Sequence, residues 1–320
     1  MKAPAKLGLY GLTLAAVFVV AGVTANAVVP EETVQNWTQS DDHDHDDEGA
    51  AVSPQRGGDL ADATSLGLGV AQDGYRLTDV GAPAQLGDGA DLSLTVIGPD
   101  GQPVTDFELE HEKELHLIVV RADGQHFQHV HPARDDQGVW TIPWQWEAGG
   151  TYRVFADFVP AGHGEGITLS TSLDVAGDLE PVQAEPATTT TVDGFEVSVD
   201  GELRAGESSE LIMSVERAGE PVTSLEPYLG AFGHLVALRD GDLAYLHVHP
   251  HGEEPQAGQT SGPEIVFEAT APTAGRYLLF LDFKVDGQVR TAPLVIDVDG
   301  AAAQSSPAQG GEHEGGSHDH

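Results

Sequence analysis

Short runs of valine, leucine, isoleucine, phenylalanine and threonine alternate with polar turn sequences along most of this chain. The turn sequences include "PDG", "ADG", "RDGD", "AGG" and "VDG". Such a pattern is typical of β-strands joined by tight turns. No amphipathic helix of useful length stands out, so we predict an all-β protein.

The chain contains an internal duplication. A shift of 118 positions aligns "GQPVTDFELEHEKELHLIVVRADGQHFQHVHP" (101–132) with "GEPVTSLEPYLGAFGHLVALRDGDLAYLHVHP" (219–250) without a gap. Further on, "GGTYRVFADF" matches "AGRYLLFLDF". The period is longer than that of solenoid repeats, which indicates tandem domains. We therefore predict two β-sandwich domains, over residues 72–176 and 192–298.

Each block has a tyrosine at the start of an apolar strand. A Gly-x-Tyr sequence leads into the strand at Tyr152 and again at Tyr277. This arrangement is similar to the tyrosine corner at the start of strand F in immunoglobulin-like domains. The similarity favours an Ig-like sandwich over a cupredoxin-like or jelly-roll barrel.

The first 29 residues are typical of a targeting segment. Lys2 and Lys6 precede an uncharged stretch that continues to Val29. The stretch ends in a small-residue "ANA" cleavage site but is also long enough to span a bilayer. Residues 1–29 are therefore expected to be a signal peptide or a membrane anchor. In both cases the positive end stays inside, and we expect an extracytoplasmic protein that is either secreted or anchored by one N-terminal transmembrane segment.

Three further segments are polar and poor in apolar residues. We interpret residues 30–71 as a disordered His/Asp-rich spacer, residues 177–191 as an interdomain linker and residues 299–320 as a disordered His-containing tail. Both His-rich segments are expected to bind divalent metal loosely. The histidines concerned are His43, His45, His313, His318 and His320.

Charge and cysteine content restrict the partners and the chemistry. There are 52 acidic against 14 basic residues, a net charge of −38, so nucleic acid and anionic membrane surfaces are not expected as partners. The chain has no cysteine, which excludes disulfides, thiolate zinc sites, iron–sulfur clusters and blue-copper centres. Any metal ion must be held by nitrogen and oxygen atoms.

The sequence "HLIVVRADGQHFQHVHP" is interpreted as a β-hairpin closed by a two-residue loop at Asp123–Gly124. Counting from that loop pairs Ile118 with His129, and His116 with His131. Residues that face each other, or lie two apart on one strand, share a face of the sheet. Three imidazoles, from His116, His129 and His131, should therefore converge.

The same count in the second repeat starts from the loop at Gly241–Asp242. It places His234 opposite His249, with His247 beside them. We therefore expect one three-histidine metal site in each domain, since neutral imidazole is the commonest metal ligand. The alternative is that these histidines are buried structural residues and that "HVHP" is the end of a strand.

Two carboxylates among apolar neighbours are candidates for a fourth ligand. Asp157 lies in "YRVFADF" and Asp282 in "YLLFLDF", and a buried carboxylate needs a partner. The alternative is that Asp157 caps its strand or pairs with Arg153 or Arg121. Four histidines without a counterpart in the other repeat are not assigned to a site: His111, His126, His163 and His251.

The paired "HVHP", the two Asp-containing strands, the N-terminal segment and the His/Asp tails resemble those of exported bacterial proteins that handle heavy metals, copper above all. This resemblance implies a non-enzymatic protein that holds Cu(II) or Zn(II) for capture, buffering or resistance, with a metal ion and an unidentified metal-transport protein as partners. The absence of cysteine departs from the electron-transfer members of that group. The alternative function is an Ig-like adhesion or scaffold protein. A metalloenzyme is a third hypothesis.

Overall fold

The computed structural model describes residues 66–246, 248–252, 254–256 and 258–300. The expected N-terminal segment, most of the spacer and the C-terminal tail lie outside the described residues. Within the described part, no helix is long and apolar enough to cross a membrane. All of its regular elements are β-strands, which confirms the predicted all-β class.

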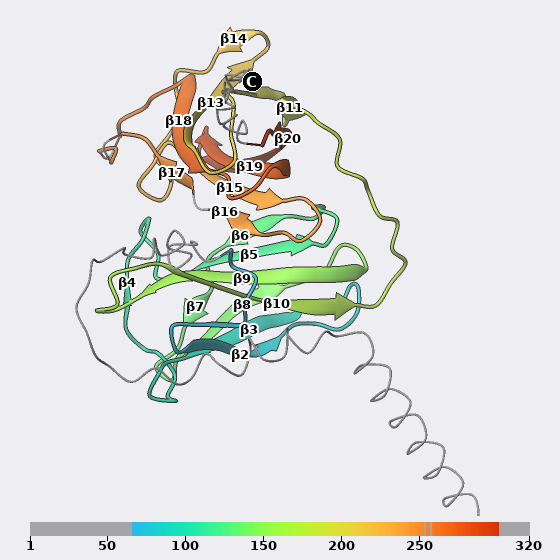
Figure 1. Ribbon diagram of the computed structural model, residues 1–320, viewed down its shortest axis with the longest axis vertical. Coiled ribbons are helices and arrows are strands. Elements are labelled where there is room, and N and C mark those ends of the chain that lie inside the picture. Colours follow the sequence, from blue (N-terminus) through green and yellow to red (C-terminus); the bar gives the residue numbers. More distant parts are fainter. Residues whose placement is uncertain (1–65, 247, 253, 257, 301–320) are drawn as a thin grey trace, which may run out of the picture. The chain divides into compact units, whose positions relative to one another are not determined.

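The first repeat forms two antiparallel sheets (Figure 1). One has the order β1-β2-β3-β8-β7, and the other has the order β10-β9-β5-β6, with β4 paired to β9. The strands are β1 (Ala71–Gln72), β2 (Tyr75–Gly81), β3 (Ala90–Ile97), β4 (Phe107–Glu108), β5 (His116–Arg121), β6 (Gln128–Val130), β7 (Ala133–Arg134), β8 (Val139–Trp144), β9 (Gly150–Pro160) and β10 (Ile167–Val175).

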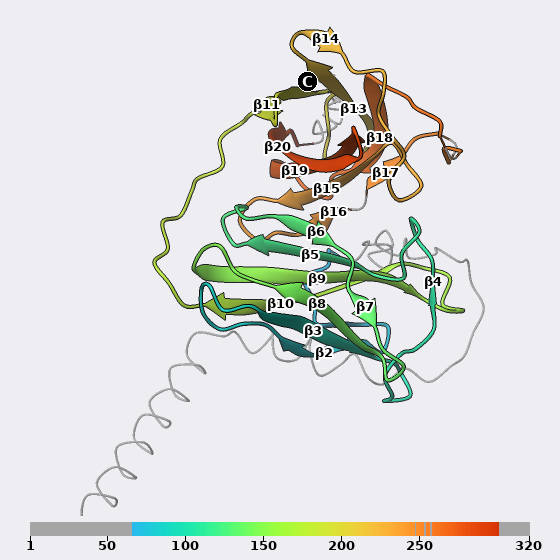
Figure 2. The same cartoon turned by 180° about the vertical axis from the view of Figure 1, so that it is seen from behind.

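The second repeat has the same arrangement, seen from behind in Figure 2. Its sheets have the orders β11-β12-β13-β18-β17, with β14 paired to β13, and β16-β15-β19-β20. The strands are β11 (Thr189–Val192), β12 (Phe195–Asp200), β13 (Ser208–Arg217), β14 (Glu220–Pro221), β15 (Gly233–Arg239), β16 (Tyr245–Leu246), β17 (Val248–Pro250), β18 (Glu264–Thr270), β19 (Gly275–Val285) and β20 (Gln288–Val298).

Both repeats are Ig-like sandwiches, as predicted. In each, the strand orders correspond to the ABED and GFC sheets of the immunoglobulin fold. The predicted tyrosine corner is also present in both. The hydroxyl of Tyr152 donates to the carbonyl of Ala148 at 2.9 Å, and that of Tyr277 donates to the carbonyl of Thr273 at 3.0 Å.

The central strands of the GFC-type sheets are buried on both faces. On β5, Leu117 and Val119 belong to the core of the first sandwich, whereas Ile118 and Val120 belong to a separate apolar cluster. Such burial explains the unbroken apolar run "HLIVV", because a strand covered on both faces has no need of alternation. The run "HLVAL" on β15 follows the same rule.

The separate cluster joins the two sandwiches, which belong to one compact unit. Phe127 of the first sandwich stacks on Phe280 of the second, with ring centroids 3.9 Å apart. Phe155 of the first lies against Tyr245 of the second at 5.7 Å. Phe127 and Tyr245 are equivalent in the duplication, as are Phe155 and Phe280, so the contact is pseudo-twofold and resembles an isologous interface.

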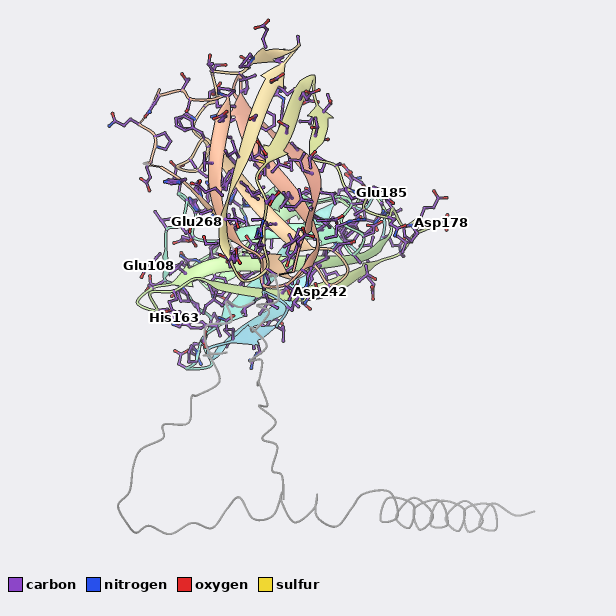
Figure 3. All side chains as sticks on the ribbon, turned by 45° about the horizontal axis from the view of Figure 1, so that its top comes forward. Glu108, His163, Asp178, Glu185, Asp242 and Glu268 are labelled. Atoms are coloured by element: carbon purple, nitrogen blue, oxygen red, sulfur yellow. The ribbon has the colours of Figure 1, made fainter. Side chains whose placement is uncertain are left out.

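Charged side chains lie mainly away from these cores. Figure 3 labels Glu108, Asp178, Glu185, Asp242 and Glu268, all of which are exposed. The exceptions are few and concentrated on the face that joins the sandwiches. There His116, His234 and Asp282 are buried, with 6%, 7% and 3% of their surface exposed.

Replacement of Tyr152 by phenylalanine is expected to lower the free energy of unfolding by about 1 kcal/mol, because the Ala148 carbonyl loses its donor. Urea unfolding followed by circular dichroism measures the change. Tyr75→Phe is the matched control, since the Tyr75 side chain is only half-buried and makes a ring contact with His163. Equal losses in both variants would contradict a stabilising tyrosine corner.

Candidate metal centre

The hairpin of β5 and β6 carries the first set of histidines. Its register pairs Leu117 with Val130 and Ile118 with His129, as predicted. The predicted two-residue loop is wrong in detail. Gly124 N–H donates to the Arg121 carbonyl at 2.8 Å, and Arg121 N–H donates to the Gln125 carbonyl at 2.9 Å, so the loop has three residues. An extra residue in the strand that follows, where His126 has a φ of 53°, restores the register.

Gly124 allows this loop to approach the second sandwich. Its φ of 77° lies in the left-handed region, and a Cβ at this position would collide with Leu278 of β19. The hairpin therefore closes against the apolar cluster between the sandwiches, with its histidines on the same face.

Three imidazole nitrogens converge on this face. His116 Nδ1 lies 3.0 Å from His129 Nε2 and 3.2 Å from His131 Nε2. All three ligand atoms lie within 4.8 Å of one another. His116 is buried; His129 and His131 are half-buried as whole residues, although the side chain of His129 is only 4% exposed. Among the described residues, this is the one group of three or more histidines, cysteines or carboxylates with such geometry.

Two outward hydrogen bonds determine where the protons are. His116 Nε2 lies 3.0 Å from the backbone carbonyl of Glu110, and His129 Nδ1 lies 2.8 Å from Asp282 Oδ2. A carbonyl and a carboxylate can only accept, so these ring nitrogens must donate. The inward nitrogens, His116 Nδ1 and His129 Nε2, therefore carry lone pairs when both rings are neutral.

Burial keeps the rings of His116 and His131 neutral over a wide pH range. Desolvation, followed by the neighbouring His129, lowers the pKa of His116 to about 4. Desolvation, followed by His129 and His116, lowers the pKa of His131 to about 2. Neutral imidazoles with lone pairs directed at one another are what a metal ion requires.

The structure places the two predicted carboxylate ligands outside this group of nitrogens. Asp282, on β19 of the second sandwich, contacts the far nitrogen of His129 and also accepts a hydrogen bond from Thr291. Asp157, on β9, accepts from Thr168 at 2.7 Å and from the Tyr245 hydroxyl. In the described part of the chain, the hydrogen bonds of Asp157 do not include Arg153 or Arg121, the two alternative partners that the sequence suggested.

The second repeat does not repeat the predicted pairing. β17, which contains His249, pairs with β18 and places His249 opposite Glu268 rather than opposite His234. The strand has crossed to the other sheet, so the expected register is wrong beyond Leu246. His247 and the side chain of His249 lie outside the described residues, as do the tail histidines His43, His45, His313, His318 and His320.

His234 nevertheless keeps one feature of its counterpart. Its Nε2 lies 2.8 Å from the carbonyl of Tyr228, six residues earlier, just as His116 Nε2 lies 3.0 Å from the carbonyl of Glu110. Desolvation, followed by the neighbouring His111, lowers the pKa of His234 to about 4. The duplication has therefore preserved the orientation of this ring.

His111, which the sequence did not assign to a site, lies close to the histidine group. It lies on a tight turn in which Glu110 and Lys113 exchange backbone hydrogen bonds, and its φ is 48°. The turn brings its ring to 4.8 Å from His234 and 6.1 Å from His116, measured between centroids. Nothing in the sequence indicated this, because turns with positive φ at both central positions usually contain Asn or Gly.

A cavity of about 60 Å³ adjoins the three-histidine group. Its lining includes His111, His116, His129, Asp157 and His234. Burial, followed by the charge of Asp157, raises the pKa of Glu110, which also lines it.

The other unassigned histidines lie elsewhere. His126 approaches Glu147 at 3.5 Å, His251 approaches Glu210 at 3.5 Å, and His163 packs against Tyr75. None of the three belongs to the convergent group.

The profile of the domain of unknown function DUF8832 matches the chain twice, over residues 70–177 and 190–300. The chain belongs to the DUF8832 family. The two matches agree with the two sandwiches of this DUF8832 protein. No protein with a curated description matches the sequence. The family description names no metal, so the expected kinship with copper-handling proteins stays a prediction.

Several solved structures are similar to the DUF8832 chain at low identity. A DUF4426 family protein from Pseudomonas aeruginosa is 8% identical, with a TM-score of 0.25, and the match covers 35% of this chain and 96% of that one. Salmonella alpha-2-macroglobulin is 14% identical, with a TM-score of 0.24 and coverages of 70% and 14%. The D0-D1 domain of intimin is 11% identical, with a TM-score of 0.21 and coverages of 70% and 97%. None of these likenesses bears on function.

The lowered histidine pKa values predict that the metal-free protein loses stability on acidification. Unfolded histidines bind a proton near pH 6.5, whereas folded His116 and His234 do so only near pH 4. The unfolded state therefore binds more protons between these values. The stability is fully present above pH 6.5 and is lost as the pH falls toward 4.

Urea unfolding in the presence of a chelator, at intervals from pH 7.5 to 4.5, measures this loss. The variant His116→Gln is the reference, because it retains the 52 acidic residues that titrate in the same range. The wild type should lose more stability than the variant over this interval. Parallel curves would contradict the neutral state of His116.

Proposed function

We propose that this protein binds one Cu(II) or Zn(II) ion through His116 Nδ1, His129 Nε2 and His131 Nε2. One observation carries the proposal: the inward nitrogens of His116 and His129 lie 3.0 Å apart. The outward nitrogens of the same two rings donate to a backbone carbonyl and to a carboxylate, which can only accept. Two lone pairs that face each other at this distance repel unless a cation lies between them.

A proton and a metal ion are the two cations to consider. His131 can itself donate from Nε2 to His116 Nδ1, but that nitrogen has a single lone pair, so His129 Nε2 is then left facing it without a donor. A tetrahedral ion accepts all three lone pairs, and two nitrogens bound to it at 2.0–2.1 Å lie about 3.3 Å apart. The separations of 3.0 and 3.2 Å are close to that value.

The donor set favours particular ions. Imidazole nitrogens suit Zn(II) and Cu(II), and Cu(II) binds more tightly by the Irving–Williams order. Calcium and magnesium prefer oxygen ligands. Among the described residues, no carboxylate belongs to the convergent group, since neither Asp157 nor Asp282 is part of it.

We propose metal capture or buffering in preference to catalysis. Ligand and substrate pockets usually measure about 300–1,000 Å³, whereas the cavity beside the three histidines measures about 60 Å³. That volume suits a few water molecules. The His129 side chain is 4% exposed, which favours retention of an ion over rapid exchange with a substrate.

We further propose that the protein works outside the cytoplasm, exported by residues 1–29, and that its His-rich tails deliver metal to the buried site or to a metal-transport protein. The positively charged start and the uncharged stretch that follows support export. Fractionation of cells that express the full chain, with and without residues 2–29, tests this: loss of the export signal should move the protein to the cytoplasm.

Titration calorimetry with Zn(II) tests the metal site directly. We use the full chain with its five tail histidines, His43, His45, His313, His318 and His320, replaced by asparagine, so that loose binding does not obscure the count. One tight equivalent is expected. The further replacement of His129 and His131 by alanine should remove it, because two of three ligands are lost.

His126→Ala in the same background is the control, because His126 lies on the same hairpin but outside the convergent group. It should keep the tight equivalent. Two results would overturn the proposal. One is tight binding retained by the variant with both His129→Ala and His131→Ala, and the other is no tight binding in the tail-substituted parent.

A further inference from the structure

The contact between His129 and Asp282 crosses from one sandwich to the other. His129 lies on β6 of the first repeat, opposite Ile118 of β5, whereas Asp282 lies on β19 of the second. Their side chains are 4% and 5% exposed, and the Nδ1–Oδ2 distance is 2.8 Å. Such a buried, charge-assisted hydrogen bond is short and directional.

The other oxygen of Asp282 is also engaged. Oδ1 accepts a hydrogen bond from the Thr291 hydroxyl on β20. Thr291 is the direct partner of Asp282 in the β19–β20 register. With Oδ1 held in this way, Oδ2 is directed at His129 and the carboxylate has one orientation.

Asp157 provides an internal comparison, because it occupies the equivalent position of the first repeat. It pairs with His116 in the strand register as Asp282 pairs with His234, and it accepts a hydrogen bond from Thr168 as Asp282 does from Thr291. Its remaining contact is with the hydroxyl of Tyr245. Of these two equivalent carboxylates, only Asp282 contacts a nitrogen of the convergent histidines, whereas Asp157 is half-buried and binds Tyr245 instead.

We propose that Asp282 is a positioning residue for the metal centre, so that the second sandwich completes a site whose ligands all come from the first. The inference rests on the proposed metal-binding function. By accepting from His129 Nδ1–H, Asp282 keeps Nε2 deprotonated, directs it inward and makes it more basic. Hydrogen bonds of this kind to a metal-binding histidine typically change metal affinity 10–100-fold.

The variant Asp282→Asn tests this role at constant size. Because Oδ1 accepts from Thr291, the amide nitrogen takes the place of Oδ2 and presents a donor to His129 Nδ1. The imidazole must then move its proton to Nε2, the nitrogen that should bind the metal. We expect the Zn(II) dissociation constant to rise about 10–100-fold.

Asp157→Asn is the matched control and should change the dissociation constant by less than about threefold. Both variants are made in the full chain with substituted tail histidines and are titrated with Zn(II). Thermal unfolding with a chelator and with excess Zn(II) adds a second readout, because a tighter ligand raises the midpoint more. Asp282→Asn should reduce the metal-induced rise in midpoint much more than Asp157→Asn does.

Three results would overturn the inference. Unchanged affinity in Asp282→Asn shows that its carboxylate does not position His129, while the metal site itself stands. Equal weakening in both variants shows a general effect of removing a buried charge. Absence of tight Zn(II) binding in the parent overturns both the proposed function and this inference. It is distinguishable from the first two results, because in those the parent itself binds Zn(II) tightly.

Discussion

The burial of both faces of β5, β9, β15 and β19 constrains everything else in this protein. An Ig-like sandwich normally has one covered face on each sheet, but here the second faces carry large apolar side chains such as Phe155 and Phe280. These faces must be removed from water, and the two repeats cover each other. The stacked rings of Phe127 and Phe280 form one of the contacts by which they do so. The association of the sandwiches is therefore part of the folding of each.

Polar groups on such a face are tolerated only when each one has a partner. His116 and His234 direct one nitrogen to a backbone carbonyl, while Asp157 and Asp282 each bind a threonine on the next strand. A buried polar group without a partner would cost several kcal/mol in an apolar environment. The inward nitrogens of His116 and His129 lie 3.0 Å apart while their outward nitrogens donate to other acceptors, and the proposed metal ion would complete the pairing there.

Within the described residues, the duplication produced equivalent residues but only one convergent group of histidines. In the first repeat the chain stays beside β5 through Val130, which holds His129 over the interface, and pairs with β8 from Ala133 on. In the second repeat it stays beside β15 only through Leu246 and pairs with β18 from Val248 on. The equivalent carboxylates have diverged in the same way: Asp282 contacts a histidine of the first repeat, and Asp157 contacts Tyr245. One half of the pseudo-twofold face thus supplies the candidate ligands, and the other supplies the residue that orients one of them.

The sequence by itself determined the fold class, the duplication and both tyrosine corners, because these depend on local turn chemistry and on the two-residue period of a strand. The pairing of Ile118 with His129 agrees with the sequence only because an extra residue after the three-residue loop restores the register. Only the tertiary structure decided the rest. Three features depend on contacts between residues far apart in the chain. They are the pairing of β17 with β18, the approach of His111 to His234, and the contact of Asp282 with a histidine of the other repeat. Strand period says which side chains share a face. It does not say which surface that face will meet, because that depends on the apolar area that both repeats must bury together.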